Sequence, residues 1–184
     1  MEKRRHMNLN NILSEGMGDI YQIYCDLDGV LVAFDERYEH FTGLKPDEWK
    51  KRANLQYGEK IATEKFWDII DNQVGARFWR GASFYHHGQE LWDYIKQYNP
   101  ILLTSPSWHD SSKEGKTMWV KENLGDYEII FRASKDKCEF AGPNKILIDD
   151  RSENISDWKS KNGIGLLYTG DAENTIRQLK QYGI

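Results

Sequence analysis

Two carboxylates, Asp26 and Asp28, lie two positions apart and are followed by Gly29. They come directly after residues 20–25, a run of β-branched and aromatic side chains that predicts a buried strand. At such a strand end, one carboxylate can ligand a metal ion and attack phosphorus while the other transfers a proton. Aspartate and glycine also favour ordinary turns. The pair therefore needs support from elsewhere in the chain before it predicts a phosphoryl-transfer site.

Two further acids, Asp149 and Asp150, follow the apolar run 145–148, and Arg151 comes next. Neighbouring carboxylates repel each other, and they are stable side by side when a cation or an arginine compensates their charge. A purely structural explanation is weakest at this position. Asp149 and Asp150 are therefore candidate metal ligands.

A hydroxyl group and a pair of lysines follow two other apolar runs. Thr104-Ser105 comes after residues 101–103 and offers a hydroxyl and a loop amide to a phosphate, although in isolation a helix N-cap would explain it better. Lys135 and Lys137 come after residues 128–132. A lysine is a compact cation suited to a phosphoryl oxygen, yet most lysine clusters are solvated surface. The position of each group after a predicted strand is what favours a functional interpretation.

The elements that must position these side chains alternate along the chain. Each predicted strand is a short, nearly continuous apolar run, as in strands covered on both faces. Stretches with helical periodicity separate them. This alternation predicts an α/β fold with a doubly wound parallel sheet and helices on both faces. The predicted strands are residues 20–25, 100–104, 128–132, 145–148 and 163–168, and the predicted helices are residues 88–98, 115–124, 155–161 and 172–182.

Residues 34–84 interrupt the alternation. They are polar, rich in aromatic residues and mostly helix-forming. We expect a small helical cap, inserted after the first strand and lying over the edge of the sheet. The core domain then comprises residues 20–33 and 85–184, and residues 1–19 form a loosely ordered head with a short helical turn at 11–14.

Together, the polar groups follow four consecutive predicted strands in the order acid pair, hydroxyl, lysine, acid pair. This order resembles the haloacid dehalogenase (HAD) superfamily, and the resemblance covers about residues 20–180. Its strongest anchors are residues 26–30, Asp-Leu-Asp-Gly-Val, and residues 147–151, Leu-Ile-Asp-Asp-Arg. The details, including Thr-Ser-Pro at 104–106 and the Gly-Lys pair at 115–116, are similar to the 5′(3′)-deoxyribonucleotidase family.

The resemblance implies a Mg²⁺-dependent phosphomonoester hydrolase that forms an aspartyl-phosphate and acts on nucleoside (deoxy) 5′-monophosphates. Asp26 would be the nucleophile, and Asp28 the general acid and base. Mg²⁺ would be held by Asp26, the backbone carbonyl of Asp28 and Asp149, with Asp150 completing the site. The residues expected to bind the phosphoryl oxygens are Thr104, Ser105, Lys116 and Lys137, with Lys135 as the less favoured alternative to Lys137.

Several aromatic residues fall in or near the predicted cap, where a ring could stack on a base. For any one of them, packing in the core of the cap is the simpler explanation. Phe34 and Trp79 are the preferred candidates for stacking. Trp108 and His109, which follow the hydroxyl motif, could rim the same pocket.

The composition limits the classes of partner that the protein is expected to bind. Among 184 residues, 39% are hydrophobic and 29% charged, which indicates a soluble globular protein, and a net charge of −4 offers nucleic acid no basic field. Neither a signal-peptide pattern nor a membrane-spanning apolar run is present, and the two cysteines, Cys25 and Cys138, fit a reducing compartment. We expect a cytoplasmic protein whose partner is a small phosphomonoester, either as a monomer or as a homodimer.

Two alternatives stay open. The same chemistry could act on another small phosphorylated metabolite or on a nucleic-acid 3′-phosphate, although the acidic charge and the cap disfavour a polymer. The chain could instead be a non-catalytic binding module on the same fold. The presence of every expected catalytic residue type disfavours that alternative.

Overall fold

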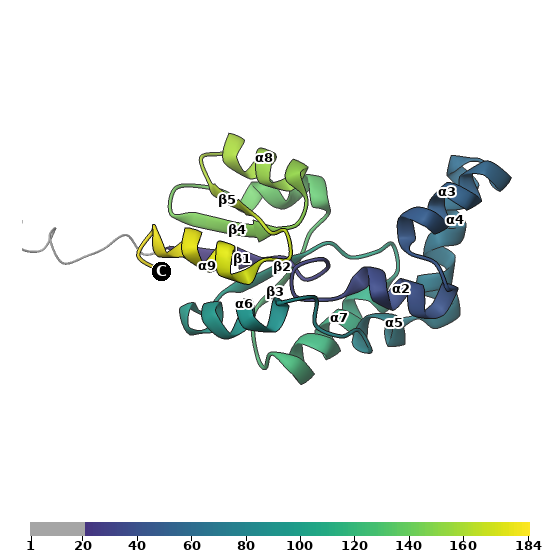
Figure 1. Ribbon diagram of the computed structural model, residues 1–184, viewed down its shortest axis with the longest axis horizontal. Coiled ribbons are helices and arrows are strands. Elements are labelled where there is room, and N and C mark those ends of the chain that lie inside the picture. Colours follow the sequence, from purple (N-terminus) through teal and green to yellow (C-terminus); the bar gives the residue numbers. More distant parts are fainter. Residues whose placement is uncertain (1–20) are drawn as a thin grey trace, which may run out of the picture.

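A five-stranded parallel sheet forms the centre of the molecule (Figure 1). The computed structural model describes residues 21–184, so the predicted head at 1–19 and its turn at 11–14 lie outside the described residues. The strand order is β3-β2-β1-β4-β5, and all neighbouring strands pair in parallel. The strands are β1 (Gln22–Cys25), β2 (Ile101–Thr104), β3 (Ile129–Phe131), β4 (Lys145–Asp149) and β5 (Ile164–Leu167).

Helices cover both faces of this sheet, which confirms the predicted α/β doubly wound fold (Figure 1). Side chains alternate along β1, so that Ile23 and Cys25 join the apolar core on one face and Tyr24 joins the core on the other. The first face is covered by α6 (Gly88–Ile95), α7 (Asp110–Asn123) and α9 (Ala172–Lys180), and the second by α8 (Ser152–Ser160) and the 3₁₀ segment η3 (Ser134–Phe140). None of the helices in residues 21–184 combines the length and the apolar character needed to cross a membrane.

The direction of the strand order reverses at β1, which lies in the middle of the sheet. The chain passes from β1 to β2 on one side and later reaches β4 on the other. Loops diverge at such a switch point and leave a crevice outside the carboxyl ends of the strands. Because Cys25 pairs in register with Ile148, Asp26 and Asp149 emerge side by side in that crevice.

Strand β3 departs from the prediction of strands covered on both faces. All three of its residues, Ile129–Phe131, are only partly buried. The reason is its place at the edge of the sheet, where one side has no neighbouring strand. A continuous apolar run does not distinguish an edge strand from a central strand, so this difference was not visible in the sequence.

Helix α7 begins earlier than the predicted start at Gly115, because polar side chains close its first turn. The Ser112 hydroxyl donates to the carbonyl oxygen of His109 at 3.0 Å and accepts from the amide of Ser107 at 3.0 Å. These bonds start the helix at Asp110. Helical periodicity of apolar residues is absent from this polar first turn, so the sequence pattern missed it.

A group of helices follows β1 and extends away from the sheet (Figure 1). They are α2 (Phe34–Thr42), α3 (Pro46–Tyr57), α4 (Glu59–Asp68), the π-helical segment η1 (Ile69–Val74) and α5 (Ala76–Arg80). These helices, which we call the cap helices, enclose an apolar cluster of their own, formed by Tyr38, Phe66, Ile70, Phe78 and Trp79.

Helix α5 connects the cap helices to the rest of the molecule by packing on α7. The approach is close at Gly115, where an added Cβ would collide with the carbonyl oxygen of Ala76 and lie 2.7 Å from the Cβ of Trp79. A larger side chain at position 115 would push the two helices apart. This glycine therefore sets the distance between α5 and α7.

Candidate active site

The loop after β1 places Asp26 at the edge of the sheet. The amide of Asp26 donates to the carbonyl oxygen of Ile148 at 2.9 Å, which ties the strand end to β4. Gly29 adopts φ +76°, and a Cβ there would collide with the carboxylate of Asp150. Glycine is thus required for the turn and for the close approach of the second acid pair.

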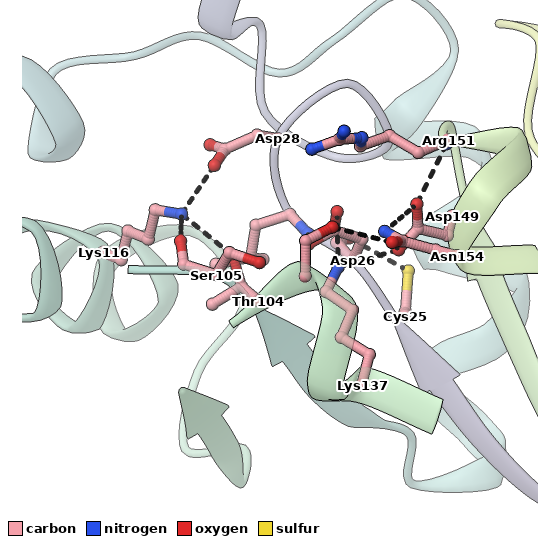
Figure 2. Close-up of polar contacts among 12 residues, drawn as sticks. Cys25, Asp26, Asp28, Thr104, Ser105, Lys116, Lys137, Asp149, Arg151 and Asn154 are labelled. Atoms are coloured by element: carbon pink, nitrogen blue, oxygen red, sulfur yellow. Dashed lines mark hydrogen bonds and ion pairs between the residues drawn. The ribbon is translucent and has the colours of Figure 1, made fainter. Parts of the chain in front are cut away.

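Three carboxylates converge at this edge, and Figure 2 labels two of them, Asp26 and Asp149. Asp26, Asp149 and Asp150 each offer an oxygen atom, and these atoms lie within 4.8 Å of one another. Asp150 is exposed at the rim of the site, but partial desolvation, followed by the charges of Asp26 and Asp149, raises its pKa to about 7. Burial together with the charge of Asp26 raises the pKa of Asp149. Such a set of crowded oxygen donors fits a hard divalent cation. These residues could therefore hold a metal ion.

Lys137 lies against the same carboxylates. Its Nζ atom is 2.8 Å from Oδ2 of Asp26 and 2.7 Å from Oδ2 of Asp149, and 1% of its side chain is exposed. Burial acts to lower the pKa of this lysine, but the two carboxylates outweigh burial and raise it above its ordinary value. The ammonium group compensates one of the three negative charges when all are ionised. The remaining two match the charge of a divalent ion.

Asn154 and Ser134 hold Asp149 in place, although sequence reasoning identified neither. The amide nitrogen of Asn154 lies 2.9 Å from both carboxylate oxygens of Asp149, and its amide oxygen accepts from the Ser134 hydroxyl at 2.7 Å. The amide of Arg151 also donates to Oδ1 of Asp149 at 2.9 Å. An asparagine in the first turn of the helix after an acid pair was the signal that could have revealed this contact.

Asp28 faces away from the three carboxylates and toward Lys116 (Figure 2). Lys116 Nζ donates to Oδ2 of Asp28 at 2.5 Å, to the Thr104 hydroxyl at 2.9 Å and to the carbonyl oxygen of Ser105 at 2.7 Å. Burial raises the pKa of Asp28, Lys116 opposes this rise, and the charge of Asp26 adds to it. The side chain of Asp28 is therefore separate from the metal-binding candidates, and its pKa lies above the ordinary value of an aspartate.

A cavity of about 360 Å³ opens in front of Asp26. Its lining includes Asp28, Ser105, Lys137 and Asp150 of the predicted site, together with Arg151. Its volume falls within the roughly 300–1,000 Å³ of small-molecule sites.

Three of the predicted phosphate-binding residues lie outside this lining. Thr104 and Lys116 are buried behind it, bonded to each other. Lys135 is exposed on the surface, whereas Lys137 reaches the carboxylates. The structure thus separates the two lysines that sequence reasoning left as alternatives.

Cap side chains form the opposite wall of the cavity. Phe34 and Trp79 both line it, with ring centroids 5.7 Å apart, but Trp79 is 3% exposed and also belongs to the apolar cluster of the cap helices. Phe66, Trp67 and Lys50 line the cavity as well. The two aromatic residues belong to the group considered from the sequence but were not the preferred candidates, and Lys50 was not identified. Trp108 and His109 line a neighbouring cavity rather than this one.

Solved structures share this architecture. A predicted phosphatase from Clostridium acetobutylicum has a TM-score of 0.54 at 14% identity, over 83% of this chain and 86% of that chain. The L-2-haloacid dehalogenase from Xanthobacter autotrophicus has a TM-score of 0.54 at 8% identity, over 90% and 84% of the two chains. A phosphonoacetaldehyde hydrolase like protein from Oleispira antarctica has a TM-score of 0.51 at 11% identity, over 90% and 82%. No family model and no curated protein matches the chain.

Sheet topology and structural likeness together define the class of this fold. It is a HAD-like Rossmannoid fold, in which a parallel α/β sheet carries acidic residues at the carboxyl end of its central strand. At identities of 8% and 14%, the likeness is one of fold. The chemistry must therefore be derived from the side chains of this chain.

Proposed function

We propose that this protein is a Mg²⁺-dependent phosphomonoester hydrolase in which Asp26 is the nucleophile, and that its substrates are nucleoside 5′-monophosphates, deoxynucleotides in particular. This proposal rests on the observation that the carboxylates occupy two separate places in the site and have different neighbours there. Asp26 lies with Lys137 and the acid pair, whereas Asp28 lies apart with a raised pKa.

Phosphoryl transfer begins with attack by a carboxylate oxygen of Asp26. A bond forms between this oxygen and phosphorus as the bond to the ester oxygen breaks, which leaves an aspartyl-phosphate. Lys137 and Ser105 line the cavity beside Asp26 and would stabilise the phosphoryl oxygens. Asp26, Asp149 and Asp150 would hold Mg²⁺, which supplies positive charge opposite those oxygens when bound.

Asp28 would supply the proton in the first step and remove one in the second. Its pKa lies above the ordinary value of an aspartate, which brings the protonated carboxyl that the leaving alkoxide requires closer to neutral pH. The resulting carboxylate then accepts a proton from the water that hydrolyses the aspartyl-phosphate. Lys116 acts through Asp28 in this scheme, because it pairs with that carboxylate, and the Thr104 hydroxyl and the carbonyl oxygen of Ser105 hold its ammonium group in place.

The proton donor also favours a phosphate ester over a haloacid. A halide leaves without a proton, so a dehalogenase has no use for a carboxyl group such as Asp28 beside its nucleophile. Displacement at carbon likewise needs no divalent cation to neutralise phosphoryl oxygens. The full set of Asp28, Lys137 and the acid pair is accounted for by phosphoryl transfer.

The shape of the cavity supports a nucleotide as the substrate. Phe34 and Trp67 offer aromatic surface to a base on the wall opposite Asp26. The cap helices stand over the cavity, which favours a small substrate over a polymer. Another small phosphorylated metabolite is the alternative substrate, and the resemblance to the 5′(3′)-deoxyribonucleotidase family favours the nucleotide.

Hydrolysis assays over nucleoside monophosphates, sugar phosphates and an aryl phosphate, with and without Mg²⁺, test this proposal. We expect Mg²⁺-dependent turnover of the nucleotides, and a loss of roughly 10⁴-fold or more in Asp26→Asn. Asp93→Asn, an exposed aspartate that pairs with Lys96 on the protein surface, is the matched control. Near-normal activity in Asp26→Asn would show that another group is the nucleophile.

A further inference from the structure

The loop that follows β2 carries part of the active site. Its residues Ser105, Pro106 and Ser107, which we call the β2 loop, all line the active-site cavity, and Ser105 is one of the residues proposed to contact the phosphoryl group. Lys116 of α7 donates to the carbonyl oxygen of Ser105 at 2.7 Å (Figure 2). The position of the β2 loop therefore decides where Ser105 can meet a phosphoryl oxygen.

Ser107 uses both of its hydrogen-bond donors within the protein. Its amide donates to the Ser112 hydroxyl at 3.0 Å, and its own hydroxyl donates to Oδ1 of Asp71 at 2.6 Å. A serine has one amide hydrogen and one hydroxyl hydrogen, so neither is left for a phosphoryl oxygen. Ser107 thus lines the cavity without serving as a phosphate donor, and its two hydrogen bonds fix the course of the β2 loop.

Asp71, the acceptor of the hydroxyl, belongs to the cap helices. It precedes Ser107 by 36 residues along the chain and is 6% exposed. It lies in η1, and π-helical segments of this kind are rare and occur frequently at functional sites. The hydrogen bond between Asp71 and Ser107 therefore joins the cap helices to the β2 loop.

Burial of an aspartate at position 71 is costly. Oδ2 is inaccessible to solvent and has no hydrogen-bond partner among residues 21–184. Burial also raises the pKa of Asp71, and the hydrogen bond from Ser107 acts against this rise. A buried polar atom without a partner destabilises the fold, whereas an apolar side chain of similar shape avoids that cost. Packing alone therefore does not account for the carboxylate.

A ring contact also joins the cap helices to the chain just beyond the β2 loop. Trp67 and Trp108 have ring centroids 6.3 Å apart at an interplanar angle of 45°, and 73% of Trp108 is exposed. Such a contact tolerates displacement, because dispersion forces have little directional preference. The 2.6 Å hydrogen bond to Asp71 has the short length typical of a carboxylate acceptor and is directional. Of the two contacts, the hydrogen bond fixes the loop more closely.

We propose that Asp71 is a positioning residue, which acts through Ser107 to hold the β2 loop, and with it Ser105, in the place that binds the phosphoryl group. This inference rests on the proposed phosphomonoester hydrolase function and deepens it. Lys116 and Ser112 hold the loop from α7, and Asp71 holds it from the cap helices. The cap helices thereby contribute to phosphate binding through a side chain that does not contact the phosphate.

A double-mutant cycle on Asp71 and Ser107 tests the proposal, with inorganic phosphate as the probe. Calorimetry in the presence of Mg²⁺ measures phosphate affinity in the wild type, Asp71→Ala, Ser107→Ala and the double variant. Each single substitution should weaken phosphate binding by about 10-fold, the size expected for one lost hydrogen bond to a charged group. The double variant should bind as weakly as either single variant and no weaker, because both substitutions break the same bond.

Hydrogen exchange gives a measurement that does not depend on activity. Amides in residues 105–112 should exchange faster in Asp71→Ala and in Ser107→Ala than in the wild type, because the loop has lost its contact with the cap helices. Asp71→Asn keeps an acceptor oxygen for the Ser107 hydroxyl and should stay close to wild type in phosphate affinity and in exchange.

Asp68→Ala is the matched control. Asp68 is an exposed acid three positions before Asp71, and its oxygens accept from Asn72 at 2.8 Å and from Gln73 at 3.0 Å. Its removal should leave phosphate affinity and loop exchange unchanged.

The proposal is overturned if Asp71→Ala or Ser107→Ala keeps the wild-type phosphate affinity, or if their losses add up in the double variant. It is also overturned if Asp71→Ala lowers only the free energy of urea unfolding, which would make Asp71 a structural residue. A wild-type protein that neither binds inorganic phosphate nor hydrolyses an aryl phosphate would instead refute the hydrolase function itself, and the positioning role with it.

Discussion

Lys116 and Asp28 form a partly buried ion pair, in which Lys116 Nζ lies 2.5 Å from Asp28 Oδ2 and the exposed fractions of the lysine and aspartate side chains are 3% and 28%. The same ammonium group holds the Thr104 hydroxyl and the carbonyl oxygen of Ser105. This arrangement joins the first loop of the site to the second. It also changes the expected role of Lys116 from direct phosphate binding to positioning the acid.

Loss of Lys116 should therefore impair proton transfer more than phosphoryl binding. We expect Lys116→Met to slow alkyl phosphates by about 10²- to 10³-fold and an activated aryl phosphate much less, because a good leaving group needs no proton. Since Lys116 lowers the pKa of Asp28, its removal should raise that pKa and shift the corresponding limb of the pH–rate profile to higher pH.

Lys113→Met is the matched control for this variant. Lys113 lies on the same helix with half of its side chain exposed, and it pairs with Asp110. It should leave both substrate types and the pH profile close to wild type. Equal slowing of alkyl and aryl substrates by Lys116→Met would argue for direct phosphate binding by Lys116.

Lys137→Met should destabilise the metal-free protein by roughly 3–5 kcal/mol, because Asp26 and Asp149 lose the cation that compensates them in a buried site. Urea unfolding measures this change. Lys135→Met replaces an exposed lysine two positions earlier and should stay within about 0.5 kcal/mol of wild type. Similar stability losses in both variants would contradict the assignment of Lys137, rather than Lys135, as the lysine that compensates Asp26 and Asp149.

Asn154→Leu should weaken metal binding while Asp149 itself is retained. The amide of Asn154 contacts both oxygens of Asp149, so its loss frees the carboxylate to rotate. We expect a decrease in Mg²⁺ affinity of about 10- to 100-fold by calorimetry, as for residues that orient metal ligands. Ser134→Ala, which removes the outer contact to Asn154, should cause a smaller decrease. Unchanged affinity in Asn154→Leu would refute this positioning role.

The pKa of Asp150 gives a dependence of stability on pH. Partial desolvation of this exposed side chain and the charges of Asp26 and Asp149 raise its pKa to about 7, from a model-peptide value near 3.9. The folded protein therefore binds more protons than the unfolded chain between pH 4 and 7, and metal-free stability should fall as pH rises through this window.

Mg²⁺ should counter this loss, because it binds the ionised carboxylates in competition with protons. The increase in Tm on adding Mg²⁺ should consequently be larger at pH 8 than at pH 6. Thermal unfolding at several pH values, with and without the ion, measures both effects. An increase in Tm that is independent of pH would contradict titration of the cluster near pH 7.

Much of the site could be predicted from the sequence, because several of its polar residues directly follow a predicted strand. Asp26, Thr104 and Asp149 each terminate or follow an apolar run, and parallel strands bring their carboxyl ends to one edge. The convergence of Asp26, Asp149 and Asp150 follows from that rule. It needs no knowledge of side-chain packing.

The order of strands does not predict which side chains of a loop or a short helical segment point into the site. Whether Lys135 or Lys137 faces the carboxylates depends on the rotation of the 3₁₀ segment η3, in which adjacent positions point in different directions. The partners of Asp28 and Asp149, namely Lys116 and Asn154, lie 88 and five residues away from them along the chain. Spacing alone does not predict which rotamer joins them.

The chain order of strands and polar groups was thus sufficient for the fold class and for the place of the acidic cluster, because backbone periodicity and burial are local properties. Tertiary packing alone decided the separation of Asp28 from the other carboxylates and the contact of Asn154 with both oxygens of Asp149, and it placed the preferred lysine, Lys137, against Asp26 and Asp149. These depend on distances between side chains from segments far apart in sequence, which hydrophobic patterning does not encode.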